Sequence, residues 1–474
     1  MRIAFCRRAV ALCLSLLFLP LLLLSQQPPA PAPTQLPAPA QQPTPLAWLE
    51  HGPWLTYPDV GAVSVGFVTG GGRVGAGVDY RRRSSEDDWQ RVWDSRGGQL
   101  QNQYSQHLIR LQDLTPGETY EYRIVLVNPA AKQFHDRNFP KEPAFRDPQL
   151  TIIAADRFHF TAFGAAAEDY VFSLTADLQF SNDVRKRILT SYHERGAMAQ
   201  SRFNVILGDA LNEINVFERD YVAGVLNHAV GLGATTQPWL FVRGNHEWRG
   251  VDAPRWGDFL ATPTGNSFFS FRCGDAYYIV MDSGEDRPAA ALTHHFSGNN
   301  ASEATYMAEQ RDWLAEVVTR KEFLNAKYRI VLCHSAPYTH GGKFMVQNLE
   351  LIIGEQFKGL EPRHRIHLWL AGHTHVYTRS IPCSNDLYAF VAPHRKLFSG
   401  NDYVFPVITT DGPGGPGTLD TSCISVAVST DTLSVTSRDE QGAVFDRCDI
   451  FPDGRIVDVP DAMSVKRFTY VPLP

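Results

Sequence analysis

The stretch FNVILGD, residues 203–209, is an apolar, β-prone run that ends on a glycine and a carboxylate. The chain carries four further runs of the same kind: VFSLTAD at 171–177, PWLFVRGNHE at 238–247, YRIVLCHS at 328–335 and IHLWLAGHTH at 366–375. Continuous apolar runs of this length are typical of buried strands in an α/β sheet. Because the carboxyl ends of such strands share one edge of the sheet, we expect their polar residues to meet there.

The polar residues after these runs are carboxylates, an amide and imidazoles, which are ligand types that suit a pair of divalent metal ions. They are Asp177, Asp209, Asn245, His334, His373 and His375. Asp209 follows a glycine that permits a sharp turn, so it is the candidate for a carboxylate that bridges two ions. His373 and His375 lie two residues apart in a tight turn, so one of them can face each ion. The sequence therefore predicts a binuclear metal site.

His246 lies beside Asn245 and is not needed as a ligand, so it is the candidate catalytic acid. Two cations lower the pKa of a shared water from ~15.7 toward neutrality, and the bridging hydroxide would attack a phosphorus atom in line. His246 would then protonate the leaving oxygen. Glu247 is expected to stand behind the ligands and to orient an imidazole.

Each motif alone has an ordinary structural interpretation. A Gly-Asp pair after a strand, as at Asp209, is most often a turn, and the segment 372–375 alone is compatible with a loop. Asn245 could simply cap a helix. The joint occurrence of all five motifs, each after a strand, favours the metal site over these readings.

The rest of the chain predicts two domains behind an N-terminal extension. The 474 residues exceed one ordinary core. Residues 47–166 show short alternating segments, as at Val63, Val65 and Phe67, and predict a β-sandwich interrupted by a long insertion at 128–157. Residues 167–455 alternate strands with helices, which predicts an α/β domain, and 456–474 form a tail. Helices are expected at 182–200, 216–230, 302–323 and 347–357, and a hairpin at 267–282.

The N-terminus carries the features of an export signal. Three arginines precede an apolar run at 9–24, which is short for a membrane-spanning helix of ~20 residues and typical of a secretory signal over residues 1–25. A secreted or periplasmic location is therefore expected, and an uncleaved membrane anchor is the alternative. Residues 26–46 are rich in Pro, Ala and Gln and form an extended linker. The net charge of −6 offers no broad attraction to nucleic acid.

The order of the five motifs resembles that of the calcineurin-like metallophosphoesterases, and the sandwich with its LTPGETYEYR stretch at 114–123 resembles the N-terminal domain of purple acid phosphatases. The resemblance covers roughly residues 48–450. It implies a fibronectin type III-like sandwich followed by a four-layer α-β-β-α domain. It also implies two ligand sets that share Asp209, with His246 as the acid. The first set is Asp177, Asp209 and His375, and the second is Asp209, Asn245, His334 and His373.

Two positions depart from the purple acid phosphatase pattern. Asn212 stands where those enzymes place a tyrosine, so a purple ferric centre is not expected. Gln179 stands where they have glycine and many relatives have histidine. Its amide oxygen is a candidate ligand of the first metal, as in some manganese-dependent pyrophosphate-cleaving relatives, and a pocket-lining amide is the alternative. Both departures favour two divalent ions, either Mn, Zn or Fe.

Substrate contacts are less visible in the sequence. Tyr338 and His340 follow His334 in a glycine-rich loop and are candidates for contact with phosphate or a leaving group. The expected activity is hydrolysis of small-molecule phosphate monoesters by an exported enzyme. The alternatives are a phosphodiesterase or nucleotide pyrophosphatase, suggested by Gln179, and a non-catalytic surface binding protein.

Overall fold

The computed structural model describes residues 49–70, 74–85, 88–127, 152–154, 157–165, 168–287, 302–337, 364–384, 387–391, 397–399, 405–413 and 421–459, with a few positions between 349 and 357. These residues fall within one compact unit that begins at Pro43. The predicted signal and linker lie outside the described residues. Among the helices of the described part, none is both long and apolar enough to cross a membrane.

The N-terminal part of this unit is built from two antiparallel sheets. The first contains β1 (Leu49–Asp59), β2 (Ala62–Thr69) and β7 (Gln106–Leu111). The second contains β10 (Phe158–Thr161), β8 (Thr119–Val127), β3 (Ala76–Arg82) and β4 (Gln90–Trp93), with β9 (Ile152–Ala154) beside β8; β5 (Ser95–Arg96) and β6 (Gln99–Leu100) form a separate pair. The two sheets share one hydrophobic cluster, in which Val65 of β2 and Val78 of β3 are fully buried.

The predicted alternation is confirmed in β7, where every second residue is buried. In β2, which carries Val63, Val65 and Phe67, every residue after Ala62 is buried. Within the stretch 114–123, the hydroxyl of Tyr120 accepts a 2.8 Å hydrogen bond from the backbone N–H of Thr115. The segment predicted as an insertion contains β9, and its residues 128–151 lie outside the described part. The N-terminal region is therefore β-rich as expected, while its assignment as a fibronectin type III-like sandwich stays a prediction.

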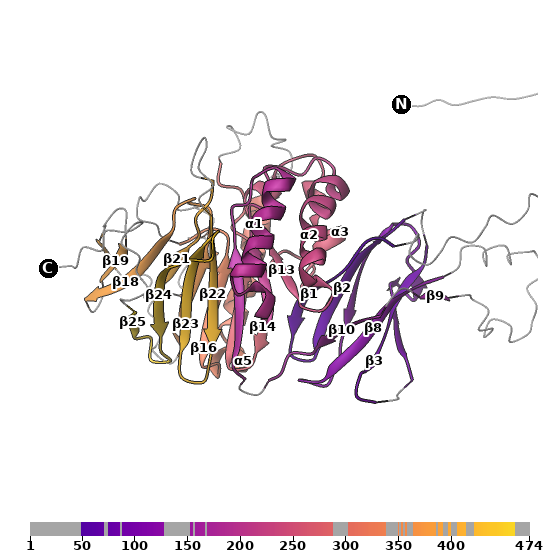
Figure 1. Ribbon diagram of the computed structural model, residues 1–474, viewed down its shortest axis with the longest axis horizontal. Helices are drawn as coiled ribbons and strands as arrows, with labels where there is room; N and C mark the ends of the chain where they lie inside the picture. Colours follow the sequence, from indigo (N-terminus) through magenta and orange to yellow (C-terminus); the bar gives the residue numbers. More distant parts are fainter. Residues whose placement is uncertain are drawn as a thin grey trace, which may run out of the picture. The chain divides into compact units, whose positions relative to one another are not determined.

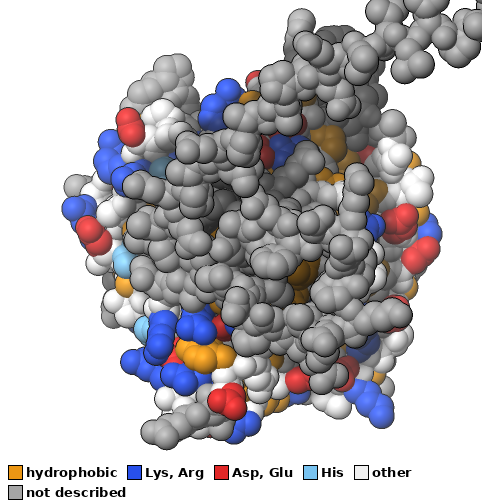
Figure 2. Space-filling view, turned by 90° about the vertical axis from the view of Figure 1, so that its right-hand side faces the viewer, with side chains coloured by type: hydrophobic (Ala, Val, Ile, Leu, Met, Phe, Trp, Pro, Cys, Tyr) orange, Lys and Arg blue, Asp and Glu red, His pale blue; other side chains and the backbone are white. Residues whose placement is uncertain are grey.

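Arginine and tryptophan side chains cover the outer face of the second sheet. The guanidinium groups of Arg81 and Arg123 lie 4.6 and 4.4 Å from the ring centre of Trp89. The buried carboxylate of Asp79 accepts hydrogen bonds from Arg123 and Arg91. Strands β3 and β8 lie at the right of Figure 1. On the face seen from that side, basic side chains gather around a hydrophobic one (Figure 2).

The C-terminal part contains two mixed sheets. The first has the order β13 (Trp239–Val242), β12 (Phe203–Leu207), β11 (Tyr170–Thr175), β22 (Ser422–Val428), β23 (Leu433–Asp439), β24 (Val444–Ile450) and β25 (Ile456–Asp458). The second has the order β14 (Phe269–Cys273), β15 (Ala276–Met281), β16 (Tyr328–Cys333), β17 (Leu368–Ala371), β21 (Val407–Thr409), β18 (Thr378–Ser384), β19 (Leu387–Val391) and β20 (Leu397–Ser399). The five motif-bearing strands are parallel to their motif-bearing neighbours within each sheet.

The alternation of side chains along the strands creates two packing layers on the second sheet. Tyr278 of β15 points to the first sheet, where its ring packs edge-to-face with the ring of Phe203 of β12. The two ring centres lie 5.4 Å apart. Ile279, the neighbour of Tyr278, belongs to a separate cluster with Leu314 and Val317, which lie on α4 (Glu303–Val317). Ile188 of α1 (Asn182–Arg195) packs with the strands of the first sheet. The two sheets are thus stacked, with α1 packed on the first and α4 on the second. Figure 1 shows α1 lying over the strands.

The predicted helices agree with the structure in three of four places. They correspond to α1 with η4 (Met198–Gln200), to η5 (Glu218–Leu226) with α2 (Asn227–Ala229) and η6 (Val230–Ala234), and to α4 with α5 (Lys321–Leu324). Further short helices are η7 (His246–Trp248), η8 (Ala253–Arg255) and α3 (Trp256–Leu260). The hairpin predicted at 267–282 is formed by β14 and β15. The helix predicted at 347–357 lies mostly outside the described residues.

Candidate metal centre

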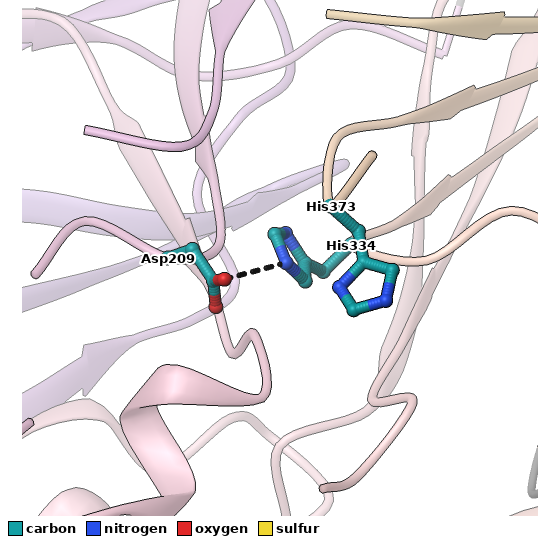
Figure 3. A group of neighbouring side chains, drawn as sticks. All are labelled: Asp209, His334 and His373. Atoms are coloured by element: carbon teal, nitrogen blue, oxygen red, sulfur yellow. Dashed lines mark ion pairs between the residues drawn. The ribbon is translucent and has the colours of Figure 1, made fainter. Parts of the chain in front are cut away.

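The seven candidate ligands follow five different strands and meet at one edge of the stacked sheets. Asp177 and Gln179 follow β11, Asp209 follows β12, Asn245 follows β13, His334 follows β16, and His373 and His375 follow β17. Two groups of three have donor atoms that all lie within 4.8 Å of one another, and both include Asp209. One group adds Asp177 and His375, and the other adds His334 and His373, as Figure 3 shows for the second group.

The backbone is left-handed at four of these ligands. The φ angles are 56° at Asp177, 52° at Asp209, 70° at His373 and 55° at His375. Only two other residues besides glycine in the described part have positive φ. Such a conformation is unfavourable for residues with a Cβ atom and persists where the surroundings enforce it, commonly at functional sites. The turns therefore redirect side chains from the strand ends into the site.

Gly208 allows the close approach of two strand ends. Its φ is +85°, and a Cβ atom built there would lie 2.5 Å from Nδ1 of His334. That imidazole nitrogen lies 2.8 Å from the carbonyl oxygen of Leu207, so it donates to this carbonyl. Nε2 of His334 is then the nitrogen that faces the carboxylates of Asp177 and Asp209.

Asp209 lies at the centre of the cluster and is buried. One carboxylate oxygen accepts the backbone N–H of His246 at 2.9 Å, and the other accepts Nε2–H of Gln179 at 2.9 Å. Nε2 of His334 lies 3.1 Å from the same carboxylate (Figure 3). Burial raises the pKa of Asp209, but the neighbouring imidazole of His334 outweighs it and holds this pKa below its ordinary value. Asp209 is therefore an ionised acceptor between both groups.

Asp177 and His375 form the outer pair of the first group. The Asp177 carboxylate accepts the backbone N–H of His373 at 2.9 Å and faces Nε2 of His375 at 3.4 Å. Nδ1 of His375 lies 3.1 Å from the carbonyl of Pro413, which orients the ring. Burial raises the pKa of Asp177 to about 6. A cation between Asp177 and Asp209 would oppose this effect.

Asn245 completes the second group with an amide oxygen. Its Oδ1 lies 3.0 Å from Nδ1 of His373, and its Nδ2 donates to Asp286 at 3.1 Å. The amide oxygen and the imidazole nitrogen therefore face the same point. Burial lowers the pKa of His373 to about 4, whereas that of His334 is raised to about 10, because Asp209 outweighs the opposing effect of burial.

Gln179 provides a test of whether the site suits a metal ion. Its Nε2 is bound to Asp209, while its Oε1 is buried and has no hydrogen-bond partner among the described residues. A buried amide oxygen without a partner is costly, and a cation beside Asp209 would satisfy it. With two carboxylates, two amide oxygens and three imidazoles, the donor set fits divalent ions.

His246 lies beside the two groups and belongs to neither. Its side chain is 20% exposed, so a substrate can reach it. Nδ1 lies 2.8 Å from the carbonyl oxygen of Asn212, which is the position that departs from the purple acid phosphatase pattern. Nε2 lies 3.7 Å from Asp209 and 2.8 Å from Nη1 of Arg249. Burial lowers the pKa of His246, and the Arg249 cation acts in the same direction, while Asp209 opposes them.

Glu247 differs from its predicted role. Its buried carboxylate orients no imidazole in the described structure; it accepts the backbone N–H groups of Asp209, Ala210 and Gly244 at 2.8–2.9 Å. It therefore ties the turn after β12 to the turn after β13. Burial raises the pKa of Glu247 to about 7. The expectation was wrong because the left-handed turns leave backbone donors that a nearby carboxylate satisfies.

Three charged residues near the site were not predicted from the sequence. Arg249, Glu285 and Asp286 form a cluster next to Asn245 and His246. Glu285 and Asp286 could have been suspected from the sequence, because they belong to the acidic stretch 282–286 at the end of the predicted hairpin. Tyr338 and His340 lie outside the described residues, so their predicted contact with substrate stays a prediction.

Comparison with known proteins agrees with this geometry. Residues 171–377 match the calcineurin-like phosphoesterase family. A phosphoenolpyruvate phosphatase from Allium cepa is 26% identical over 191 residues, which is 38% of this chain and 36% of that relative. The fold is similar to purple acid phosphatase PPD1 from yellow lupin, with a TM-score of 0.55 and 14% identity over 84% of this chain and 74% of that one. It is also similar to PhoD, with a TM-score of 0.53 and 11% identity over 90% and 93%.

The match to the phosphoenolpyruvate phosphatase thus spans about a third of that protein's length. The family match begins within β11 and ends after the Gly-His-Thr-His motif, so it includes all seven candidate ligands and His246. The predicted resemblance is therefore confirmed: residues 171–377, which contain every candidate ligand and His246, match the calcineurin-like phosphoesterase family.

Proposed function

We propose that this chain is an exported phosphoesterase that uses two divalent ions to hydrolyse phosphate monoesters. The observation that carries the proposal is the pair of ligand groups that share the buried carboxylate of Asp209. Membership of the phosphoesterase family supports phosphate ester hydrolysis in general. The name of the Allium cepa relative, a phosphatase, favours monoesters among the possible substrates.

The ions, when bound, would lower the pKa of a water molecule and neutralise charge on the phosphate. The first would be held by Asp177, Asp209 and His375, together with Gln179, and the second by Asp209, Asn245, His334 and His373. Asp209 would hold both, because it belongs to both groups. Asn212 in place of tyrosine supplies no phenolate to a ferric ion, so we propose Mn, Zn or Fe in the divalent state.

His246 would supply the proton to the leaving group. Its Nδ1 donates to the Asn212 carbonyl, and its Nε2 accepts from Nη1 of Arg249 at 2.8 Å, so Nε2 is the nitrogen that would have to take up a proton before passing it to the substrate. When the bond between phosphorus and the ester oxygen breaks, the proton of Nε2 goes to that oxygen and the imidazole becomes neutral. Arg249 beside the ring favours this loss of charge.

Export is proposed from the first 25 residues, which carry arginines before an apolar run. The test is expression of the full chain and of a chain lacking residues 1–25, with the protein located by cell fractionation. Export predicts that only the full chain leaves the cytoplasm and that its N-terminal region is removed. Recovery of the full chain with the membrane at its intact mass would support the anchor instead.

The activity is tested with p-nitrophenyl phosphate and its bis-ester after loading with Mn, Zn or Fe, and metal content is measured by elemental analysis. We expect two ions for each chain and faster turnover of the monoester. Faster turnover of the diester would favour the rival activity, a phosphodiesterase or pyrophosphatase, for which the buried oxygen of Gln179 is the supporting observation. Absence of turnover in both His246→Ala and the unaltered protein would indicate a binding protein.

A further inference from the structure

The amide of Asn245 must present its oxygen, and not its nitrogen, to the second metal position. An amide nitrogen is a donor of hydrogen bonds and a poor ligand, whereas the oxygen is a good one for divalent ions. The side chain is nearly symmetric in shape, so packing alone does not select one orientation. Some partner must therefore distinguish its two ends.

Asp286 is that partner. Its Oδ1 lies 3.1 Å from Nδ2 of Asn245, and an ionised carboxylate only accepts hydrogen bonds. The amide NH₂ is thereby directed to Asp286, which leaves Oδ1 of Asn245 facing Nδ1 of His373 at 3.0 Å. The exchange of the two amide ends would bring an oxygen against the carboxylate, which is unfavourable.

Asp286 is itself held in place by a buried arginine. Nη2 of Arg249 donates to Oδ1 of Asp286 at 2.6 Å. Arg249 also donates to both carboxylate oxygens of Glu285, at 2.8 and 2.6 Å, and the side chains of Arg249 and Glu285 are 2% and 1% exposed. Glu285 in turn accepts the backbone N–H groups of Asp286 and Arg287. The loop after β15 is thus fixed against the turn that carries Asn245.

We propose that Asp286, anchored by the Arg249–Glu285 pair, is a positioning residue that turns the amide oxygen of Asn245 toward the second metal position. This inference rests on the proposed function, since it requires that the second ion binds. It assigns to the acidic loop after β15 a role in metal affinity. Positioning groups of this kind typically contribute 10- to 100-fold in metal affinity.

The test is a titration of the metal-free full chain with Mn²⁺. Calorimetry measures the affinity for each ion, and electron paramagnetic resonance detects the signal of the coupled ion pair. The unaltered protein should bind two ions. In Asp286→Ala the second ion should bind 10- to 100-fold more weakly, while the affinity for the first is unchanged. Asp286→Asn should restore most of the loss, because its amide oxygen still accepts from Asn245. The matched control is Asp312→Ala, an exposed carboxylate on α4.

If Asp286→Ala folds poorly on its own, the same substitution is tested in a second variant, Asn245→Asp. In Asn245→Asp the ligand has two equivalent oxygens, so orientation no longer matters. Adding Asp286→Ala to it should leave the second affinity unchanged or raise it, because a like charge is removed. An equal loss in both backgrounds, unchanged affinity in Asp286→Ala, or no rescue by Asp286→Asn would each overturn the inference. If the unaltered protein binds fewer than two ions, the binuclear proposal itself fails.

Discussion

Replacement of Glu247 by glutamine tests whether its carboxylate holds the ligand-bearing turns together. Oε2 accepts the backbone N–H groups of Asp209 and Gly244, and Oε1 accepts that of Ala210. A glutamine can keep its oxygen at only one of these two positions. In the more favourable orientation its NH₂ group faces the N–H of Ala210, so one buried donor loses its acceptor.

The expected cost follows from these contacts. An unsatisfied buried N–H costs about 1–3 kcal/mol. The raised pKa of Glu247 indicates that its buried charge is not stabilised overall, so we add no cost for the loss of that charge. Local opening of both turns should then be easier by about 1–3 kcal/mol, or roughly 5- to 150-fold in the opening equilibrium. The carboxylate is ionised at pH 8, above its raised pKa of about 7, so the measurement belongs there.

The assay is hydrogen exchange of the metal-free protein at pH 8, read for peptides that cover 207–210 and 243–245. Glu247→Gln should lose protection in both peptides together, although they belong to different strands. The control is Glu316→Gln, which removes an exposed pair with Arg320 on α4 and should change nothing in these peptides. Loss of protection below threefold, or in one turn only, would refute the bridging role of Glu247.

Three further predictions follow from particular contacts. Gly208→Ala should weaken metal binding at least tenfold in calorimetry, because its Cβ would lie 2.5 Å from a ligand imidazole and its φ is +85°. Burial lowers the pKa of His367 from 6.5 to about 4. Between these two pH values the imidazole binds a proton in the unfolded chain but not in the folded one. The free energy of unfolding should therefore fall as the pH drops from about 6.5 to about 4, by up to about 3 kcal/mol. Urea unfolding of His367→Gln should show a flatter pH dependence over that interval. Asp79→Asn should lower the free energy of unfolding by about 1–2 kcal/mol, since its two arginine partners are partly exposed and screened.

The sequence predicted well which polar residues meet at this edge of the sheets, because each of these candidate ligands follows an apolar run. A buried strand such as β12 has an unambiguous pattern, and parallel strands bring their ends to one edge. The polar residue after each run therefore lies in the site whatever the lengths of the intervening loops. That logic located Asp209 and His334, although 124 residues separate them in the chain.

The role of Glu247 and the presence of Asp286 could not be predicted in the same way. Both act through hydrogen bonds whose partners are set by three-dimensional packing and not by a repeat along the chain. Glu247 has the residue type of a carboxylate that supports a histidine, and only the turn geometry shows that its partners are backbone donors. Asp286 follows a strand that is predicted as half of a hairpin, and its loop carries no ligand motif.

The left-handed turns explain why these supporting carboxylates are needed. A non-glycine residue at positive φ costs of order 1–3 kcal/mol, and four ligands adopt this conformation. The turns are closed by other members of the cluster: Asp177 accepts the N–H of His373, Asp209 accepts that of His246, and Glu247 accepts that of Asp209. The backbone strain at one ligand is thus offset by a hydrogen bond to another ligand or to Glu247. The protein's own hydrogen bonds thus tie the turns of the two ligand groups to one another.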